Sequence, residues 1–397
     1  MALTFDEARI FAALDAFQLD LPSWGFANSG TRFRVFPQAG TPRNPTEKIE
    51  DAGTVHRLTG AAPFVSLHIP WDRADSYDNL VSDAAALGLR IGGINSNTFQ
   101  DEDYRLGSLA HPDAAIRKRA LEHIFDCCDI VKATGAQALK VWLGDGTNYP
   151  GQDDFRSRKQ RLEEALAAIH ARLPEPARLL IEYKFYEPAF YHTDIQDWGM
   201  AMLLCQRAGE RARVVVDLGH HAHAVNIEQI VAILISEGRL GAFDLNDRKY
   251  GDDDLIAGSI NPYQLFLIFN ELASAGASDR PDGVAQCARG VAYMVDQCHN
   301  IEPKVPAMLR TVTVLQQQWL KAQLVDRGRL RSAQTLGDIL GANDCLRDAY
   351  ETDVRPILAR WREARGLPGD AVAAYADSGE DGARTQSRRG GVAAGWG

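Results

Sequence analysis

The sequence lacks any hydrophobic run that approaches the roughly 20 residues needed to cross a bilayer. Its first residues, MALTFDEARIFAALDAF, have the spacing of an amphipathic helix rather than a secretory signal. Cysteine is sparse, with six residues, no CxxC pair and no regular framework, which argues against disulfides and a zinc knuckle. We therefore expect a soluble, cytoplasmic protein with reduced thiols and no membrane partner.

Basic charge is also in short supply. The formal net charge is −10 at pH 7, and no basic stripe with interleaved aromatic residues offsets it. Such a surface repels phosphate backbones, so nucleic acid is not an expected partner. No Gly-rich turn follows the first apolar runs, which argues against a dinucleotide-binding fold.

What the chain of 397 residues does contain is a repeated pattern, in which a short apolar run closes on a polar residue and is followed by a helical stretch. This alternation favours a parallel sheet covered by helices. Seven runs are read as strands: 64–70, 89–97, 138–146, 178–184, 213–219, 241–247 and 291–297. With an eighth strand near 23–30, the pattern predicts a (β/α)8 TIM barrel with additional N- and C-terminal helices.

Helical spacing of apolar residues marks 115–133 and 158–173 between the strands, and continues beyond residue 300. The last stretch is rich in Gly, Ser and Arg, which is typical of a mobile tail. The chain therefore divides into four parts: an N-terminal helix, first strand and inter-subunit loop (1–60), the main barrel (61–300), a C-terminal helical extension (301–375) and a flexible tail (376–397).

Four successive strands end in a carboxylate, and these residues are Glu182, Asp217, Asp244 and Asp296. In a TIM barrel the carboxyl ends of the strands meet in one site. A buried carboxylate is costly unless it is paired or bound to a cation, so the four acids together indicate a divalent metal site.

Each acid also has a plainer explanation when it is taken alone. A single Asp at a strand end, such as Asp217, is more often a turn former or a helix N-cap. Glu182 is a poor cap, but Lys184 lies on the same face of an extended chain, and the two would also make a structural ion pair. The metal hypothesis depends on the four acids converging.

Several longer motifs resemble bacterial L-rhamnose isomerase, in order, from about residue 20 to residue 370. They include SWGFANSGTRFRVFPQAGTPR (23–43), SLHIPWDR (66–73), KVWLGDGTNYPGQ (140–152), IEYKFYEPAFYHTD (181–194), VDLGHHAH (216–223), KYGDDDLIAGSINPYQLFLIFNEL (249–272) and MVDQCHN (294–300). The resemblance implies a barrel of the xylose isomerase kind, a homotetramer, a sugar substrate, and two divalent metal ions per subunit, typically Mn²⁺, with Co²⁺ or Mg²⁺ as alternatives.

Carried over by position, the resemblance assigns three ligands of the metal that binds substrate oxygens: Glu182, Asp217 and Asp296. The fourth ligand in that family is a histidine, and this chain has Asp244 in its place. A shorter, negatively charged side chain is expected to change the position of the metal and its preference.

The same resemblance makes Glu182 the bridging carboxylate to a second metal. The other ligands of that metal are assigned from the loop after the fifth of these runs and from the acidic triplet at 252–254: His220, Asp252 and Asp254. If the triplet is locally extended, Asp253 points away from the site.

The expected reaction moves a hydrogen between C1 and C2 of an aldose, either as a hydride or through an enediol, and the sequence leaves both routes open. The residues assigned to catalysis are His68, Lys184 and Asp252. Asp252, or a hydroxide held by a metal, is the candidate base for the enediol route. Substrate contacts are assigned to His68, Trp142, Phe33 and Phe36, the last two on a loop that reaches a neighbouring subunit's site in the resembling family.

L-Rhamnose to L-rhamnulose is the favoured conversion, with activity on D-allose and D-psicose and other rare sugars. Two alternatives remain open at this point. A metal-dependent hydrolase could use the same barrel, since paired metals also cleave phosphoesters. A non-catalytic sugar-binding relative could result from the change at Asp244.

Overall fold

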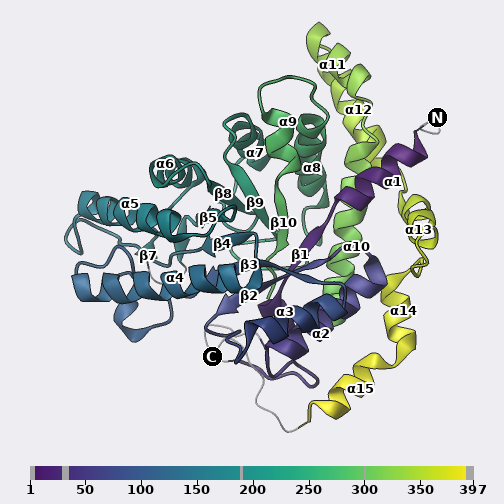
Figure 1. Ribbon diagram of the computed structural model, residues 1–397. Coiled ribbons are helices and arrows are strands. Elements are labelled where there is room, and N and C mark those ends of the chain that lie inside the picture. The colour runs from purple at the N-terminus through teal and green to yellow at the C-terminus, as the bar shows by residue number, and fades with distance from the viewer. Residues whose placement is uncertain (1–4, 29–34, 188–190, 299–300, 390–397) are drawn as a thin grey trace.

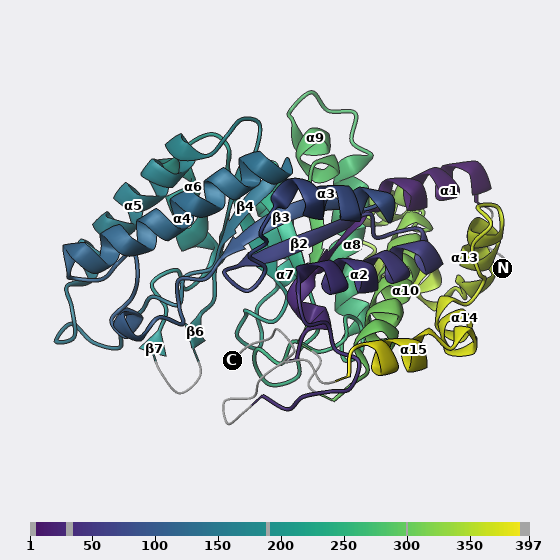
Figure 2. The same ribbon diagram turned by 60° about the horizontal axis from the view of Figure 1, so that its bottom comes forward.

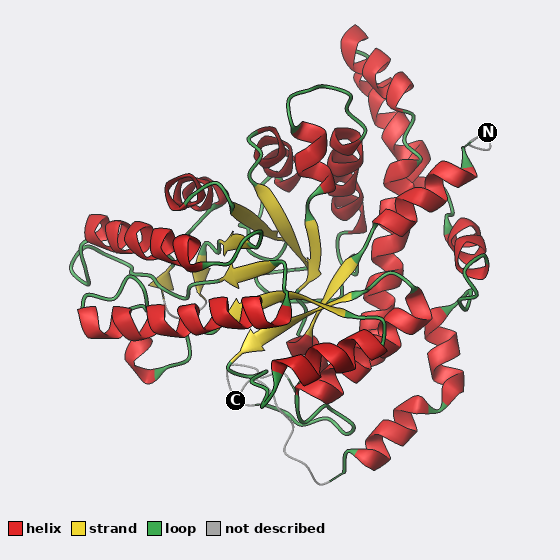
Figure 3. Ribbon diagram, in the orientation of Figure 1, coloured by secondary structure: helices red, strands yellow, loops and turns green. Residues whose placement is uncertain are grey.

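A computed structural model of the chain describes residues 5–28, 35–187, 191–298 and 301–389. Eight parallel strands close into a barrel in the order β1, β10, β9, β8, β5, β4, β3, β2 (Figure 3). They are β1 (Leu19–Pro22), β2 (Phe64–Ile69), β3 (Arg90–Ser96), β4 (Ala138–Val141), β5 (Arg178–Glu182), β8 (Ala212–Asp217), β9 (Leu240–Leu245) and β10 (Ala292–Val295). The predicted (β/α)8 barrel is confirmed.

A helix follows each strand and covers the outside of the barrel (Figure 1). In α7, for example, Ile227, Ile230, Val231 and Leu234 are buried at helical spacing, so one apolar face packs on the strands. The eight helices are α2 (Pro45–Thr59), α3 (Tyr77–Ala86), α4 (Ala114–Thr134), α5 (Phe155–Arg172), α6 (Trp198–Ala208), α7 (Ile227–Ser236), α8 (Pro262–Gly276) and α10 (Lys304–Gln323).

Shorter elements interrupt this alternation. A small antiparallel hairpin, β6 (Tyr186–Glu187) and β7 (Tyr191–His192), stands between β5 and α6, and α9 (Val284–Arg289) precedes β10. Two 3-10 turns, η1 (Ser23–Phe26) and η2 (Glu102–Tyr104), follow β1 and β3. These insertions lengthen the connections without breaking the barrel.

Additional helices lie at both ends of the chain, as predicted. α1 (Glu7–Ala16) precedes the barrel, and α11 (Arg327–Leu336) and α12 (Ile339–Glu351) pair and project from it. α13 (Arg355–Glu363), α14 (Ala371–Ser378) and α15 (Glu380–Ser387) run down one side of the barrel, next to α10 and α2 (Figures 1 and 2).

The first strand differs in place from the expected one near 23–30. β1 covers Leu19–Pro22, and the chain then turns into η1. The strand was missed because it is short, ends in proline and carries Asp20, whose carboxylate is buried and accepts a hydrogen bond from Ser66 Oγ at 2.8 Å. A Cβ on Gly92 would lie 2.0 Å from Asp20 Oδ2, so glycine leaves room for this acid.

The end of the chain also differs from the flexible tail expected over 376–397. α14 extends to Ser378, and α15 follows it. Arg384 and Arg388 of this segment both contact Asp51 of α2, at 2.8 Å. Residues 390–397 lie outside the described residues, and the division into four parts stays a prediction.

All six cysteines are free thiols, as expected. Within the described ranges, no helix combines the length and the apolar character that a membrane crossing requires.

Candidate metal centre

Two layers of inward-facing side chains fill the barrel on five neighbouring strands. The lower layer is apolar and consists of Ala138, Leu180, Val215, Ala242 and Met294. Side chains alternate along a strand, so the residue two positions after each of these also points into the barrel. Those residues form the charged layer, which consists of Lys140, Glu182, Asp217, Asp244 and Asp296. The converging carboxylates of the sequence prediction are therefore neighbours in one ring.

Lys140 lies among these acids and is buried. Its Nζ is 2.5 Å from Asp244 Oδ2 and 3.4 Å from Glu182 Oε2. It also lies 5.5 Å from the centre of the Trp24 ring, and Trp24 Nε1 donates a hydrogen bond to Asp296 Oδ1 at 2.7 Å. One side of the centre is thus built around an ammonium group.

His220 occupies the other side of Glu182. Its Nδ1 lies 3.2 Å from Glu182 Oε1 and 2.9 Å from the Tyr183 carbonyl oxygen. Its Nε2 lies 3.9 Å from Asp217 Oδ2 and 3.2 Å from Asp252 Oδ1. A carbonyl on Nδ1 fixes the ring so that Nε2 faces the acids, which is how metal-binding histidines are commonly oriented.

The three residues of the acidic triplet, 252–254, differ in where they lie. Asp252 Oδ1 lies 3.2 Å from His220 Nε2, so this carboxylate reaches the centre, and its Oδ2 pairs with Lys184 Nζ at 2.7 Å. Asp253 turns back and accepts hydrogen bonds from the amides of its own loop, including Tyr250 N at 2.7 Å. Asp254 has a φ of 47°, so the segment is not fully extended as the alternation argument assumed.

The electrostatics of the centre favour positive charge. Burial raises the pKa of Glu182, but Lys140 and His220 outweigh it and lower the value to about 2. Burial raises the pKa of Asp217 to about 7. Burial opposes the charge of Lys140, but Asp244 and Glu182 outweigh it and raise the pKa of Lys140 well above its usual range, so this side chain is an ammonium. Burial opposes protonation of His220, yet Asp217 and Asp252 raise its pKa well above the usual value. The field that retains this proton also attracts a metal cation.

The donor set fits a hard divalent cation. Ligand atoms of Glu182, Asp217 and His220 lie within 4.8 Å of one another, and the same holds for Glu182 with Asp217, Asp244 and Asp296. Among the described residues, Asp244 Oδ1 is buried without a hydrogen-bond partner. Asp252 and Asp254 are not part of either group of ligand atoms. The acidic and histidine cluster can therefore bind a metal, while the role of each ligand stays a prediction.

Aromatic side chains line the mouth of the barrel next to this cluster. The His68 ring stacks on Trp71 with centroids 4.0 Å apart and meets Trp24 edge-on at 5.5 Å. Trp142 contacts Phe99 at 4.7 Å, and Lys184 Nζ lies 5.3 Å from the Trp142 ring centre. The predicted residues His68, Trp142 and Lys184 thus border the cluster.

The two phenylalanines assigned to a neighbouring subunit's site are not brought to the cluster by this chain. Phe33 lies outside the described residues. Phe36 is exposed. Their predicted contact with a second subunit stays a prediction.

Three residues of the centre were not assigned a role from the sequence: Lys140, Trp24 and Asn246. Asn246 Nδ2 donates to both carboxylate oxygens of Asp217, at 3.0 and 3.1 Å. For Lys140 a signal was present, because a lysine within the apolar run ALKVW is rarely buried unless it is paired. Its partners come from other strands and could not be named.

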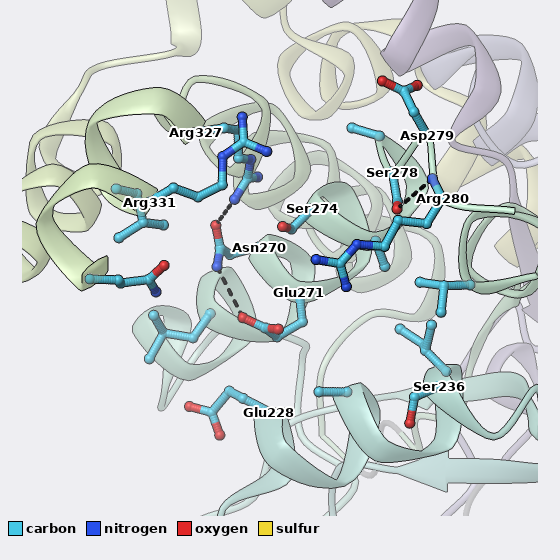
Figure 4. A pocket seen from close by; sticks show the side chains of 18 of the residues that line it. Glu228, Ser236, Asn270, Glu271, Ser274, Ser278, Asp279, Arg280, Arg327 and Arg331 are labelled. Carbon is cyan, nitrogen blue, oxygen red and sulfur yellow. Dashed lines mark hydrogen bonds between the residues drawn. The ribbon is translucent and has the colours of Figure 1, made fainter. Parts of the chain in front are cut away.

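A cavity of about 1030 Å³ lies elsewhere, between α7, α8 and α11 on the outside of the barrel (Figure 4). Arg327 donates a hydrogen bond to Asn270, which in turn donates to Glu271 at 3.2 Å. Its lining includes none of the residues of the charged layer. The candidate site is therefore assigned to the cluster at the strand ends.

Comparison with known proteins agrees with this architecture. Residues 55–274 match the family model described as "Xylose isomerase-like TIM barrel". A protein of Mesorhizobium japonicum named as a probable sugar isomerase is 46% identical over 377 residues, which cover 93% of this chain and 86% of the relative. A second probable sugar isomerase, from Rhizobium meliloti, is 44% identical over 399 residues, covering 99% of this chain and 91% of the relative.

Among solved structures, a D-psicose 3-epimerase determined in the presence of D-fructose resembles the chain with a TM-score of 0.52. It is 11% identical, and the match covers 78% of this chain and 98% of that one, so it shows a shared fold only. From the family match over more than half of its length and from the two close relatives, the chain belongs to the xylose isomerase-like TIM barrel family.

Proposed function

We propose that the protein is a metal-dependent aldose–ketose isomerase. The observation that carries this proposal is the position of Glu182, which offers one carboxylate oxygen to Lys140 and the other to His220. Such an arrangement places concentrated positive charge at the mouth of a barrel, where an open-chain sugar can reach it. Both close relatives are named probable sugar isomerases, which supports the same reaction class.

A divalent cation held by Glu182, Asp217 and His220 would supply Lewis acidity to two neighbouring sugar oxygens. Lys184 adds a positive charge beside them. Burial opposes that charge, but Asp252 and Glu187 outweigh it and raise the pKa of Lys184, so the side chain is an ammonium at neutral pH. This charge stabilises an alkoxide developing on the substrate.

Asp252 is the residue best placed to move a proton. Burial raises its pKa, yet His220 and Lys184 together hold it below its usual range, so the group is a carboxylate at neutral pH. Oδ2 is engaged by Lys184 at 2.7 Å, and Oδ1 faces His220 at 3.2 Å. We assign Asp252 as the base of the enediol route, in which its carboxylate would take the proton from C2 and return it to C1, while the hydroxyl proton moves from O2 to O1.

His68 and the surrounding rings bind the rest of the sugar. Burial holds the pKa of His68 well below its usual value, so the ring is neutral. Its Nδ1 has no hydrogen-bond partner among the described residues and is free to meet a sugar hydroxyl. Trp142 and Phe99 present an apolar wall for the C–H face of the sugar and exclude water.

The proposed substrate is L-rhamnose, converted to L-rhamnulose, with D-allose and D-psicose as a second pair, because the strand-end motifs resemble those of L-rhamnose isomerase. The proposed metal is Mn²⁺, with Co²⁺ or Mg²⁺ as alternatives, and the resemblance implies two ions per subunit in a homotetramer. Native mass spectrometry of the assembly tests the tetramer.

The test is a sugar panel on the metal-stripped protein with Mn²⁺, Co²⁺ or Mg²⁺ added back. L-Rhamnose, D-allose, L-mannose and L-lyxose are followed by NMR for ketose formation, D-fructose for epimerisation at C3, and a phosphodiester for hydrolysis. The proposal expects ketose from at least one aldose and no phosphate release. Turnover of only the phosphodiester, or only epimerisation, would replace the proposed reaction.

A further inference from the structure

We propose that the Lys140 ammonium takes the place of a second metal ion, so that each protomer holds one divalent cation, on the His220 side of Glu182. The inference rests on the proposed metal-dependent function and deepens it. It differs from the two ions that the resemblance implies, and it follows from where Lys140 lies.

Lys140 belongs to the same layer as the four acids, two residues beyond Ala138 of the apolar layer. Its Nζ is in hydrogen-bond contact with Asp244 Oδ2, at 2.5 Å, and 3.4 Å from Glu182 Oε2. A metal bound to these two oxygens would have to share them with an ammonium group. The two cations would then repel each other at close range.

The Lys140 side chain has little room to move away from the acids. Its side chain is only 6% exposed, and it extends from the interior face of a strand closed on both sides by neighbours. Asn95 of β3 and Leu180 of β5 are its register partners. Withdrawal from the acids would leave a buried ammonium without a counterion, which is costly.

Asp244 stands at the position where the resembling family has a histidine, and it pairs with Lys140. A neutral histidine at this position would offer Lys140 no countercharge. Asp244 supplies one through Oδ2, and among the described residues its other oxygen remains buried without a partner. Lysine and aspartate are therefore matched to each other, and Asp244 acts as the counterion of Lys140 in place of a metal ligand.

Among the residues that the structure describes, no lysine belongs to the group of ligand atoms on the other side of Glu182. Ligand atoms of Glu182, Asp217 and His220 converge there within 4.8 Å of one another, and Asp252 Oδ1 approaches His220 Nε2 at 3.2 Å from the loop. Lys184 contacts Asp252 through its outer oxygen, Oδ2, and leaves Oδ1 facing His220. This side keeps carboxylate oxygens and an imidazole nitrogen available, which is the donor set that Mn²⁺ accepts.

The experiment counts metal, independently of turnover. Protein is saturated with Mn²⁺, freed of excess ion, and analysed for Mn by plasma mass spectrometry and for spin coupling by electron paramagnetic resonance. The expected result is one Mn²⁺ per protomer without coupling. Two Mn²⁺ per native protomer, coupled through a shared carboxylate, would overturn the inference.

Two variants separate the roles of the pair. Lys140→Met removes the charge at similar length, and the expected Mn²⁺ content rises from one to two per protomer, with a coupled signal. Asp244→Asn is expected to keep one Mn²⁺ and to change its dissociation constant less than about threefold. A folded Lys140→Met protein that still binds one Mn²⁺, or an Asp244→Asn protein that loses its metal, contradicts the assignment.

Lys48→Met is the matched control, because Lys48 is a second buried lysine and pairs with Asp72 at 2.6 Å. Its removal also takes the countercharge from a buried aspartate, but outside the charged layer. The expected Mn²⁺ content stays at one per protomer, and a second ion in this variant would show that the gain is not specific to Lys140.

If the variants do not fold, the Mn²⁺ count in the native protein decides alone. A protein that binds one Mn²⁺ but converts no sugar would refute the proposed function and leave this inference intact.

Discussion

Glu182 is the carboxylate of the charged layer that contacts both sides of the centre, Lys140 at 3.4 Å and His220 at 3.2 Å. Glu182→Gln keeps the shape of the side chain and removes the negative charge that pairs with the Lys140 ammonium and would bind the metal. We expect kcat to fall on the order of 1,000-fold, with the far-UV circular dichroism spectrum unchanged. Glu164→Gln on the exposed face of α5 is the control and keeps full activity. Near-normal turnover by Glu182→Gln would remove Glu182 from the site.

Lys184 is expected to contribute to the rate rather than to the fold. Its ammonium pairs with Asp252 at 2.7 Å and with Glu187 at 2.8 Å. Lys184→Met removes the charge beside the reacting oxygens, and we expect kcat to fall on the order of 100-fold, with KM changed less. Steady-state kinetics beside Lys249→Met, an exposed lysine of the loop after β9, measure this. Equal losses in both variants would mean that Lys184 is not part of the site.

At this scale the sequence identified residues that follow an apolar run and missed those within one. Glu182, Asp217, Asp244 and Asp296 were readable because a carboxylate at a strand end is conspicuous. Lys140 was not assigned, since its partners stand on β5 and β9, 42 and 104 positions further along the chain. The local geometry of Asp254 was also beyond prediction, because its positive φ depends on how the loop closes.

Strand β1 carries a pH-sensitive contribution to stability. Burial raises the pKa of Asp20 from 3.8 to about 7, so the folded protein holds this proton while the unfolded chain loses it near pH 3.8. The stability that the protonated group provides is therefore complete below pH 3.8 and is lost as the pH rises through about 7. The effect is about 4 kcal/mol.

The Asp20→Asn variant has no titrating group at this position, so it isolates the pH-dependent contribution of Asp20 to stability. We expect the free energy of unfolding of Asp20→Asn, relative to the native protein, to increase by up to about 4 kcal/mol between pH 4 and pH 8. Urea unfolding of both metal-free proteins at several pH values measures the difference. A difference that stays constant with pH would show that Asp20 titrates normally.

Helix α15 is attached to the barrel through charge. Asp51 of α2 is buried and accepts from Arg384 Nε at 2.8 Å and from Arg388 Nη1 at 2.8 Å. Asp51→Asn leaves two arginines without their shared counterion, so we expect the amides of α15 to exchange with solvent at least tenfold faster, with the barrel strands unaffected. The control is Glu50→Gln, because Glu50 is exposed and its carboxylate lies 3.4 Å from Arg388 Nη2. Hydrogen exchange of both variants measures the effect. Unchanged protection in Asp51→Asn would mean that apolar packing alone holds the helix.

Among the elements, those with strong periodicity were predicted closely. α4 and α5 lie within a few residues of the expected ranges because one apolar face repeats along each helix. β1 was displaced, since a four-residue strand with a buried aspartate and a terminal proline has no readable alternation. α15 is held by ion pairs with a distant helix, which composition does not reveal.

At the scale of the whole molecule, barrel closure creates the site. β4, β5, β8, β9 and β10 are neighbours in one ring, so residues spread from 140 to 296 meet in one layer. The carboxylates cannot remain together without cations, and the chain provides one in Lys140. The fold could be predicted because the strand and helix pattern repeats, whereas the balance of charge within the ring depends on the full closure.

We propose that a divalent cation bound at the charged layer gives the protein its sugar isomerase activity. The most direct measurement is ketose formation from L-rhamnose and D-allose by chelator-treated protein as Mn²⁺ is added back in steps. The account predicts no ketose without metal, and activity that rises with Mn²⁺ and reaches its plateau at one ion per protomer. Full activity in the chelated protein, or none at any Mn²⁺ concentration on either sugar, would contradict it.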